Sequence, residues 1–176
     1  MAELVAVCSP DSQISYRIAS TEYAGPESLF QVDPDSGRLM VAKLLDREDK
    51  AVHRITILAE TDSSPTLNVY TELVLQVLDE NDNSPLFGLP AYEVSVSEAV
   101  LAHTPVIQVL ATDLDFGNNG EITYRFSEES RGSLAHLFSI DPHNGWVTTQ
   151  GLLDYEATPS YSLTVVATDN GKDRRS

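Results

Sequence analysis

Short runs in which apolar and polar residues alternate fill much of the chain. Clear examples are residues 73–77 (Leu-Val-Leu-Gln-Val), 92–97 (Tyr-Glu-Val-Ser-Val-Ser) and 161–165 (Tyr-Ser-Leu-Thr-Val). Each run has a period of two residues and is rich in Val, Thr or Tyr, which is the pattern of a half-buried β-strand. No long stretch combines a helical period with capping residues. The pattern therefore predicts an all-β fold.

The pattern also repeats along the chain with an offset of 108 positions. Residues 29–37 (Leu-Phe-Gln-Val-Asp-Pro-Asp-Ser-Gly) return as residues 137–145 (Leu-Phe-Ser-Ile-Asp-Pro-His-Asn-Gly), and residues 14–18 return as residues 122–126. Both Asp-Pro-to-Gly segments predict hairpin turns, because Pro sets φ early and Gly accepts a positive φ late. Two copies of one unit account for most of the chain.

About seven short strands in each unit of roughly 100 residues indicate a β-sandwich. Pro85 and Pro90, with Gly88 between them, mark the boundary between the copies, since Pro cannot donate to a central strand ladder. We therefore expect a first domain of residues 1–83 and a second of residues 84–176.

Composition fits a folded protein with an acidic surface. The 176 residues are 41% hydrophobic and 22% charged, and 27 acidic against 11 basic residues give a formal charge of −16. Such a surface repels nucleic acid and suits cations or a basic partner. The single cysteine, Cys8, excludes an internal disulfide. No stretch reaches the length of a membrane span, and the first twenty residues lack the apolar core of a signal peptide. If the protein is extracellular, we expect this chain to be a fragment of a longer one.

The acidic residues gather at the ends of the expected strands. Residues 45–48 (Leu-Asp-Arg-Glu) precede the boundary, residues 79–83 (Asp-Glu-Asn-Asp-Asn) span it, and residues 113–115 (Asp-Leu-Asp) follow it. Calcium binds six to eight oxygens from carboxylates, amides and main-chain carbonyls, and these segments are rich in all three. The sequence therefore predicts a calcium cluster at the boundary.

Other uses of these carboxylates fit less well. A glycosidase needs a carboxylate pair in which an apolar pocket raises one pKa, and the surroundings here are polar. An EF-hand is a poor match, because Gly117 stands where the loop needs its third oxygen ligand and no flanking helices are expected. We find no serine-hydrolase, phosphate-loop or paired-cysteine motif. We therefore expect a protein that is not an enzyme.

Four motifs in this order and spacing resemble cadherin repeats over nearly the whole chain. They are Leu-Asp-Arg-Glu at residues 45–48, Asp-Glu-Asn-Asp-Asn-Ser-Pro at 79–85, Ala-Thr-Asp-Leu-Asp-Phe-Gly-Asn-Asn-Gly at 111–120 and Ala-Thr-Asp-Asn-Gly at 167–171. The resemblance implies two tandem seven-stranded Greek-key β-sandwich domains, the first lacking strand A and the second lacking strand G. It also implies three Ca²⁺ ions at the central linker. The ligands implied there are Asp46, Glu48, Asp79, Glu80 (carbonyl), Asn81, Asp82, Asn83 (carbonyl), Asp113, Asp115, Asn119 (carbonyl) and Asp169.

A second, incomplete site is implied in the second unit. Glu98, Asp154 and Glu156 form half of a calcium site for a following linker, while the first unit has no counterpart of Glu98. At the outer end of the first unit, Cys8-Ser9-Pro10 stands where Asp113-Leu114-Asp115 stands in the second, so no calcium site is expected there.

The resemblance implies a calcium-dependent cell–cell adhesion module in the extracellular part of a single-pass plasma-membrane protein. Its partners would be other cadherin ectodomains, by homophilic or heterophilic contact, and not nucleic acid or a small-molecule substrate. The alternative is a calcium-stiffened spacer of a cell-surface receptor whose ligand binds other repeats.

A few remaining side chains have structural interpretations. Tyr16 and Tyr124 occupy the same place in both copies, which favours a core position. Trp146 aligns with Arg38, so we expect it to face outward at a turn. The four histidines, which have no metal-ligand spacing, are expected to face solvent; they are His53, His103, His136 and His143.

Overall fold

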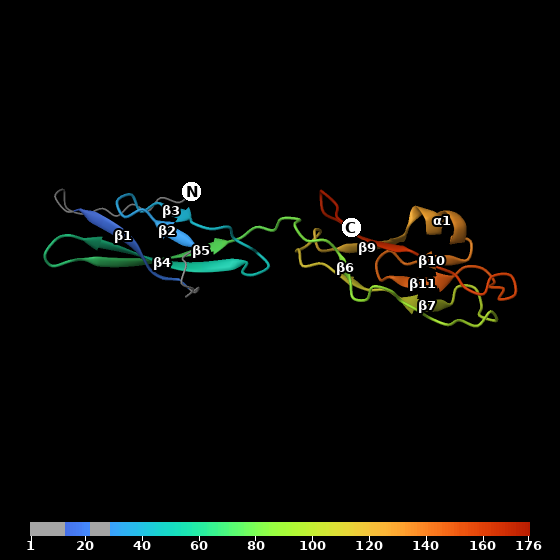
Figure 1. Ribbon diagram of the computed structural model, residues 1–176. Helices are drawn as coiled ribbons and strands as arrows, with labels where there is room; N and C mark the ends of the chain where they lie inside the picture. Colours follow the sequence, from blue (N-terminus) through green and yellow to red (C-terminus); the bar gives the residue numbers. More distant parts are fainter. Residues whose placement is uncertain (1–12, 22–28) are drawn as a thin grey trace. The chain divides into compact units, whose positions relative to one another are not determined.

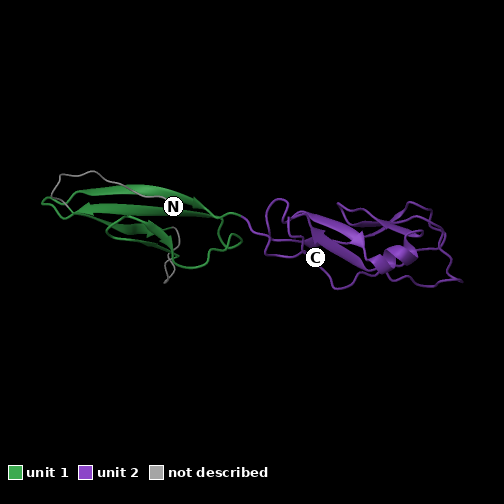
Figure 2. Ribbon diagram, turned by 90° about the horizontal axis from the view of Figure 1, so that it is seen from above, with its two compact units in different colours: residues 1–78 green, residues 79–176 purple. Residues whose placement is uncertain are grey.

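The computed structural model describes residues 13–21 and 29–176 of the chain. Contacts divide the chain into two compact units, unit 1 of residues 1–78 and unit 2 of residues 79–176, which are drawn in different colours in Figure 2. Residues 79–83 thus group with unit 2, and a domain boundary after Asn83 stays a prediction. Cys8 and the segment Cys8-Ser9-Pro10 lie outside the described residues.

Unit 1 contains five strands in the described residues (Figure 1). They are β1 (Ile14–Thr21), β2 (Phe30–Val32), β3 (Leu39–Val41), β4 (Val52–Thr61) and β5 (Asn68–Gln76). One antiparallel sheet has the order β1-β4-β5, and β2 and β3 form a separate hairpin. A β-bulge interrupts β1 between Ile18 and Ser20.

The core of unit 1 lies under β4, where side chains alternate between the interior and the surface. Ile55 and Ile57 are 0% and 1% exposed, and they pack with Tyr16 of β1 and Phe30 of β2. The core position expected for Tyr16 is confirmed. His53 was expected to face solvent, which is wrong: it lies on the same side of β4 as the two isoleucines, and its ring meets that of Phe30 edge-on at 5.1 Å.

Unit 2 is built from seven strands and one short helix. The strands are β6 (Leu86–Phe87), β7 (Pro105–Gln108), β8 (Ala111–Thr112), β9 (Ile122–Phe126), β10 (Phe138–Ile140), β11 (Trp146–Thr149) and β12 (Val165–Asp169). They form the antiparallel groups β10-β11-β7, β12-β9 and β6-β8. Helix α1 (Glu128–Leu134) follows β9. No helix in the described part of the chain is long and apolar enough to cross a membrane.

Two hydrophobic clusters fill unit 2. Tyr124 and Ala167 pack with Val109 in one, and Phe126, Phe138 and Val147 form the other. The hydroxyl of Tyr124 accepts a hydrogen bond from the backbone N–H of Ala111 at 2.9 Å, which satisfies its polar end within the core. Tyr124 is thus a core residue, as expected, and Trp146 faces outward with 40% of its surface exposed.

The Asp-Pro-to-Gly segments form the same turn in both units, as their repeat predicts. The N–H of Gly37 donates to the carbonyl of Asp33 at 3.0 Å, and that of Gly145 donates to Asp141 at 3.0 Å. Both glycines have a positive φ, of 70° and 71°, a conformation that side-chain-bearing residues rarely adopt. The turns connect β2 to β3 and β10 to β11.

Three local features differ from the expected strands. Residues 92–97 alternate in polarity but form no ladder in unit 2, and only Val165 of residues 161–165 belongs to a strand, at the start of β12. Helix α1 was not expected, although Ser127 caps it by accepting from the N–H of Ser130 at 3.3 Å. The all-β class is nevertheless confirmed, since α1 has only seven residues.

Candidate calcium site

Residues 79–83 run across the loops at one end of unit 2, and Asp79 makes the first contacts. One of its carboxylate oxygens accepts from the backbone N–H of Phe116 at 3.0 Å, and the other accepts from the side-chain amide of Asn119 at 2.8 Å. Phe116 and Asn119 lie in the loop between β8 and β9. Asp79 is therefore fixed to this loop through both oxygens.

Asn81 reaches the end of β12. Its side-chain amide nitrogen donates to the carboxylate of Asp169 at 3.1 Å and to the carbonyl of Asp173 at 2.9 Å. Asp169 is fully buried and also accepts from the N–H groups of Gly171 and Arg175. The amide oxygen of Asn81 is buried and has no hydrogen-bond partner among the described residues.

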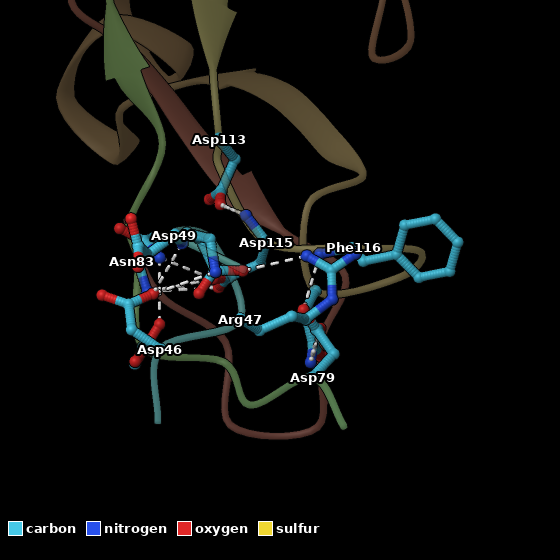
Figure 3. Close-up of polar contacts among 11 residues, drawn as sticks. Asp46, Arg47, Asp49, Asp79, Asn83, Asp113, Asp115 and Phe116 are labelled. Carbon is cyan, nitrogen blue, oxygen red and sulfur yellow. Dashed lines mark hydrogen bonds and ion pairs between the residues drawn. The ribbon is translucent and has the colours of Figure 1, made fainter. Parts of the chain in front are cut away.

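Asn83 contacts the Asp-Leu-Asp segment that follows β8 (Figure 3). Its side-chain amide donates to the Asp115 carboxylate at 2.7 Å, and its backbone N–H lies 3.2 Å from the same group. Asp113 accepts from the N–H of Asp115 at 3.0 Å through one oxygen. Its other oxygen is buried without a partner in the described residues.

These contacts concentrate carboxylates at one end of unit 2. Five carboxylates contribute to this end of unit 2, and two of them, Asp115 and Asp169, are 8% and 0% exposed. Burying ionised carboxylates is costly unless a positive charge compensates them. The unpartnered oxygens of Asn81 and Asp113 are hard oxygen donors of the kind that Ca²⁺ prefers. The residues present therefore fit a divalent cation.

Most of the expected ligands of unit 2 lie in this cluster. Asp82 also belongs to it and accepts from the side chain of Asn83 at 2.9 Å, while the carbonyl of Glu80 accepts from the N–H of Asp82 at 3.0 Å. Asn119 was expected to contribute its carbonyl, and the structure adds a role for its side chain in holding Asp79.

Asp46 and Glu48 lie in unit 1, in the loop between β3 and β4. Asp46 accepts from the N–H groups of Glu48 and Asp49 at 2.9 and 3.2 Å, and so stabilises its own turn. Glu48 forms an ion pair with Arg47 at 2.9 Å. Their participation in a calcium site stays a prediction from the sequence.

Glu98, Asp154 and Glu156 form a second acidic group within unit 2. One carboxylate oxygen from each lies within 4.8 Å of the other two, and all three residues are exposed. Glu98 also accepts from the N–H of Tyr155 at 3.0 Å. The structure thus brings together the three residues that the sequence assigned to an incomplete site.

Sequence reasoning missed two residues at the main cluster. Arg175 donates from its guanidinium to the carbonyl of Asp82 at 3.1 Å, and Gly171 packs against the side chains of Asn81, Asn119 and Asp169. The 108-residue repeat contains a signal for Arg175. It aligns Arg175 with Leu67, so the second copy carries a positive charge where the first copy has an apolar residue.

A family model for the cadherin domain matches the chain twice, over residues 6–78 and 92–176. The chain belongs to the cadherin family. Its two matched segments follow the two copies of the repeat, so the family match and the internal repeat agree on two tandem cadherin domains.

Curated relatives share about a third of the residues of this cadherin chain. Protein dachsous of Drosophila melanogaster is 36% identical over 168 residues, which cover 90% of this chain and 5% of that protein. Human Protocadherin Fat 4 is 36% identical over 166 residues, which cover 94% of this chain and 3% of that protein. The chain therefore spans only a small part of the length of these relatives.

Solved cadherin structures share the fold. The EC22-24 fragment of mouse Cadherin-23 has a TM-score of 0.81 and 29% identity, and covers 98% of this chain and 56% of that one. The extracellular domain of Protocadherin GammaB4 has a TM-score of 0.81 and 29% identity, and covers 93% of this chain and 26% of that one. These similarities confirm the β-sandwich class expected from the sequence.

Proposed function

We propose that the cluster at residues 79–83 binds Ca²⁺ and that the chain is a calcium-dependent cell–cell adhesion module of an extracellular cadherin. The observation that carries the proposal is the pair of buried, unpartnered oxygens of Asn81 and Asp113 beside the buried carboxylates of Asp115 and Asp169. Membership of the cadherin family supports it further.

In this proposal the ligands of unit 2 come from three segments. Residues 79–83 supply carboxylate, amide and carbonyl oxygens, Asp113, Asp115 and Asn119 supply the next set, and Asp169 supplies the last. Asp46 and Glu48 of unit 1 complete the site, as the sequence predicts. Bound Ca²⁺ supplies positive charge that offsets the mutual repulsion of these carboxylates.

Ligands drawn from both domains would make calcium a stiffener of the joint between them. Without calcium, repulsion between the carboxylates favours a flexible joint. We expect millimolar calcium to raise the thermal midpoint and to narrow the spread of interdomain angles in small-angle scattering. Identical scattering and melting curves in chelator and in calcium would contradict the proposal.

Calorimetric titration with calcium tests the ligand assignment. Asp82→Ala and Asp115→Ala each remove a carboxylate from the cluster, and we expect calcium affinity to fall about tenfold or more, because ligand charge sets the affinity of such sites. Asp35→Ala removes an exposed turn carboxylate of unit 1 and is the matched control. Equal affinity in all three variants would refute the assignment.

Bead aggregation tests the adhesive part of the proposal. Beads coated with the chain should aggregate in calcium and disperse in chelator, and beads coated with Asp115→Ala should aggregate less, with other cadherin ectodomains as the partners. Calcium binding without aggregation would instead favour a calcium-stiffened spacer whose ligand binds other repeats. The three residues Glu98, Asp154 and Glu156 would serve the next linker in the longer protein.

A further inference from the structure

Residues 172–175 fold back beside residues 79–83 within unit 2. The guanidinium of Arg175 donates to the carbonyl of Asp82 at 3.1 Å, and the carbonyl of Asp173 accepts from the side chain of Asn81 at 2.9 Å. These bonds join two segments that are about ninety positions apart in the sequence. Neither bond uses a carboxylate oxygen of the candidate calcium site.

The equivalent loop of unit 1 has the same backbone pairing but lacks the charged side chain. The N–H of Thr61 donates to the carbonyl of Leu67 at 3.1 Å, just as that of Asp169 donates to the carbonyl of Arg175 at 3.1 Å. In the other direction, the N–H of Leu67 donates a hydrogen bond to the Thr61 hydroxyl at 3.0 Å, and the N–H of Arg175 donates one to the Asp169 carboxylate. Unit 2 therefore keeps the loop and adds a hydrogen-bond donor at its end.

We propose that Arg175 is a positioning residue, a latch that holds residues 79–83 on unit 2 when no divalent cation is bound. Arg is protonated at every physiological pH, so the donor is always available. Because Arg175 bonds to the main-chain carbonyl of Asp82, it does not occupy the carboxylate of that residue. Its charge also offsets part of the repulsion among the neighbouring carboxylates.

The latch has a consequence for calcium binding, and this consequence rests on the proposed function. A segment that is already held close to its bound position loses less conformational freedom when the ion binds. Arg175 therefore strengthens calcium binding through a hydrogen bond, although its positive charge by itself opposes the ion. The effect of the hydrogen bond and the effect of the charge can be distinguished by substituting Arg175 and, separately, a neighbour of equal charge.

Hydrogen exchange of the full chain in chelator tests the latch directly. Arg175→Leu installs the residue of the equivalent position in unit 1, and the amides of Asp82 and Asn83 should exchange on the order of 3- to 10-fold faster, as expected for the loss of one hydrogen bond. The matched control is Arg174→Leu, which removes an exposed charge next to Arg175. Arg175→Lys keeps a donor and should restore part of the protection.

The result that would overturn the latch is equal exchange in the wild type and Arg175→Leu, or the same acceleration in Arg174→Leu. Calcium titration of the same proteins separates the latch from the proposed function. We expect Arg175→Leu to bind calcium several-fold more weakly than Arg174→Leu. If the wild type binds no calcium while Arg175→Leu still loosens the segment in chelator, the proposed function fails and the latch stands.

Discussion

Gly171 follows the buried carboxylate of Asp169 at a place with no room for a side chain. A Cβ atom there would lie 2.5 Å from the amide nitrogen of Asn81, 2.7 Å from the amide oxygen of Asn119 and 2.9 Å from a carboxylate oxygen of Asp169. All three neighbours are expected calcium ligands or lie next to them. The absence of a side chain at Gly171 therefore lets the side chains of Asn81, Asn119 and Asp169 lie close together.

Gly171→Ala is expected to displace these side chains and to weaken calcium binding about tenfold, because a metal site depends on the placement of its ligands. Calorimetric titration measures the change. Gly132→Ala is the control, since a Cβ atom at this position of α1 meets nothing within 4 Å and Ala favours helix more than Gly does. Unchanged affinity in Gly171→Ala would show that the site tolerates the displacement.

At the scale of single elements, β4 carries the core of unit 1. Ile55 is fully buried in it, so Ile55→Ala should lower the free energy of unfolding of unit 1 by about 2–5 kcal/mol. Val74→Ala on the neighbouring strand β5 is the control, because Val74 is 58% exposed and surface substitutions usually change stability by about 0.5 kcal/mol or less. Urea unfolding measures both, and similar losses would contradict this description of the core.

The turn between β10 and β11 makes the stability of unit 2 depend on pH. A hydrogen bond from the backbone N–H of His143, with a second from that of Asn144, holds the pKa of Asp141 below its ordinary value of 3.8. A carboxyl whose pKa is lower in the folded state stabilises the fold above its unfolded pKa. That contribution is lost as the pH falls through the folded pKa.

Asp141→Asn keeps an oxygen acceptor but removes the charge. The wild type should therefore be more stable than the variant at pH 7, and the difference should shrink as the pH falls from above the ordinary Asp pKa of 3.8 through the lower pKa of the folded state. Urea midpoints of both proteins at several pH values measure it, with Asp35→Asn as a control turn carboxylate. A difference that stays constant with pH would show that the charge of Asp141 does not contribute.

The same elements show what the sequence could predict. The Asp-Pro-to-Gly turns and the two core tyrosines followed from local chemistry that repeats 108 residues apart, and the structure confirms them. Residues 92–97 have the alternation of a strand, but a strand also needs a partner, and alternation alone does not supply one. Helix α1 is too short for a helical period, although Ser127 followed by Glu128 and Glu129 is a start signal that the sequence does contain.

The candidate site also has parts that the sequence predicts and parts that it does not. Its carboxylates could be predicted because their spacing matches a known family. The contacts of Arg175 and of the Asn119 side chain could not, since hydrogen bonds between distant segments leave no local pattern; the repeat shows only that Arg175 carries a charge where Leu67 has none. The burial of His53 was missed for a related reason. Its place on the inner side of β4 follows from the period of two, but a single polar residue in such a run gives no sign of its burial.

At the scale of the whole molecule, each unit has its own core, so calorimetry can follow the two unfolding transitions separately. Ile55→Ala identifies the transition of unit 1. If Asp46 and Glu48 are ligands, calcium raises the midpoints of both transitions. At a hundredfold excess over its dissociation constant a ligand stabilises by about 2.7 kcal/mol, which corresponds to an upward shift on the order of 10 °C for a domain of this size.

The double variant Asp46→Ala/Glu48→Ala then distinguishes a site shared by both domains from one that unit 2 forms alone. We expect calcium to raise only the transition of unit 2 in this variant, because the ligands of unit 2 remain while those of unit 1 are gone. In the control variant Asp35→Ala, in the turn between β2 and β3, calcium should still raise the midpoints of both unfolding transitions. If calcium raises the transition of unit 2 but not that of unit 1 in the wild type, Asp46 and Glu48 are not ligands, and unit 2 binds calcium alone.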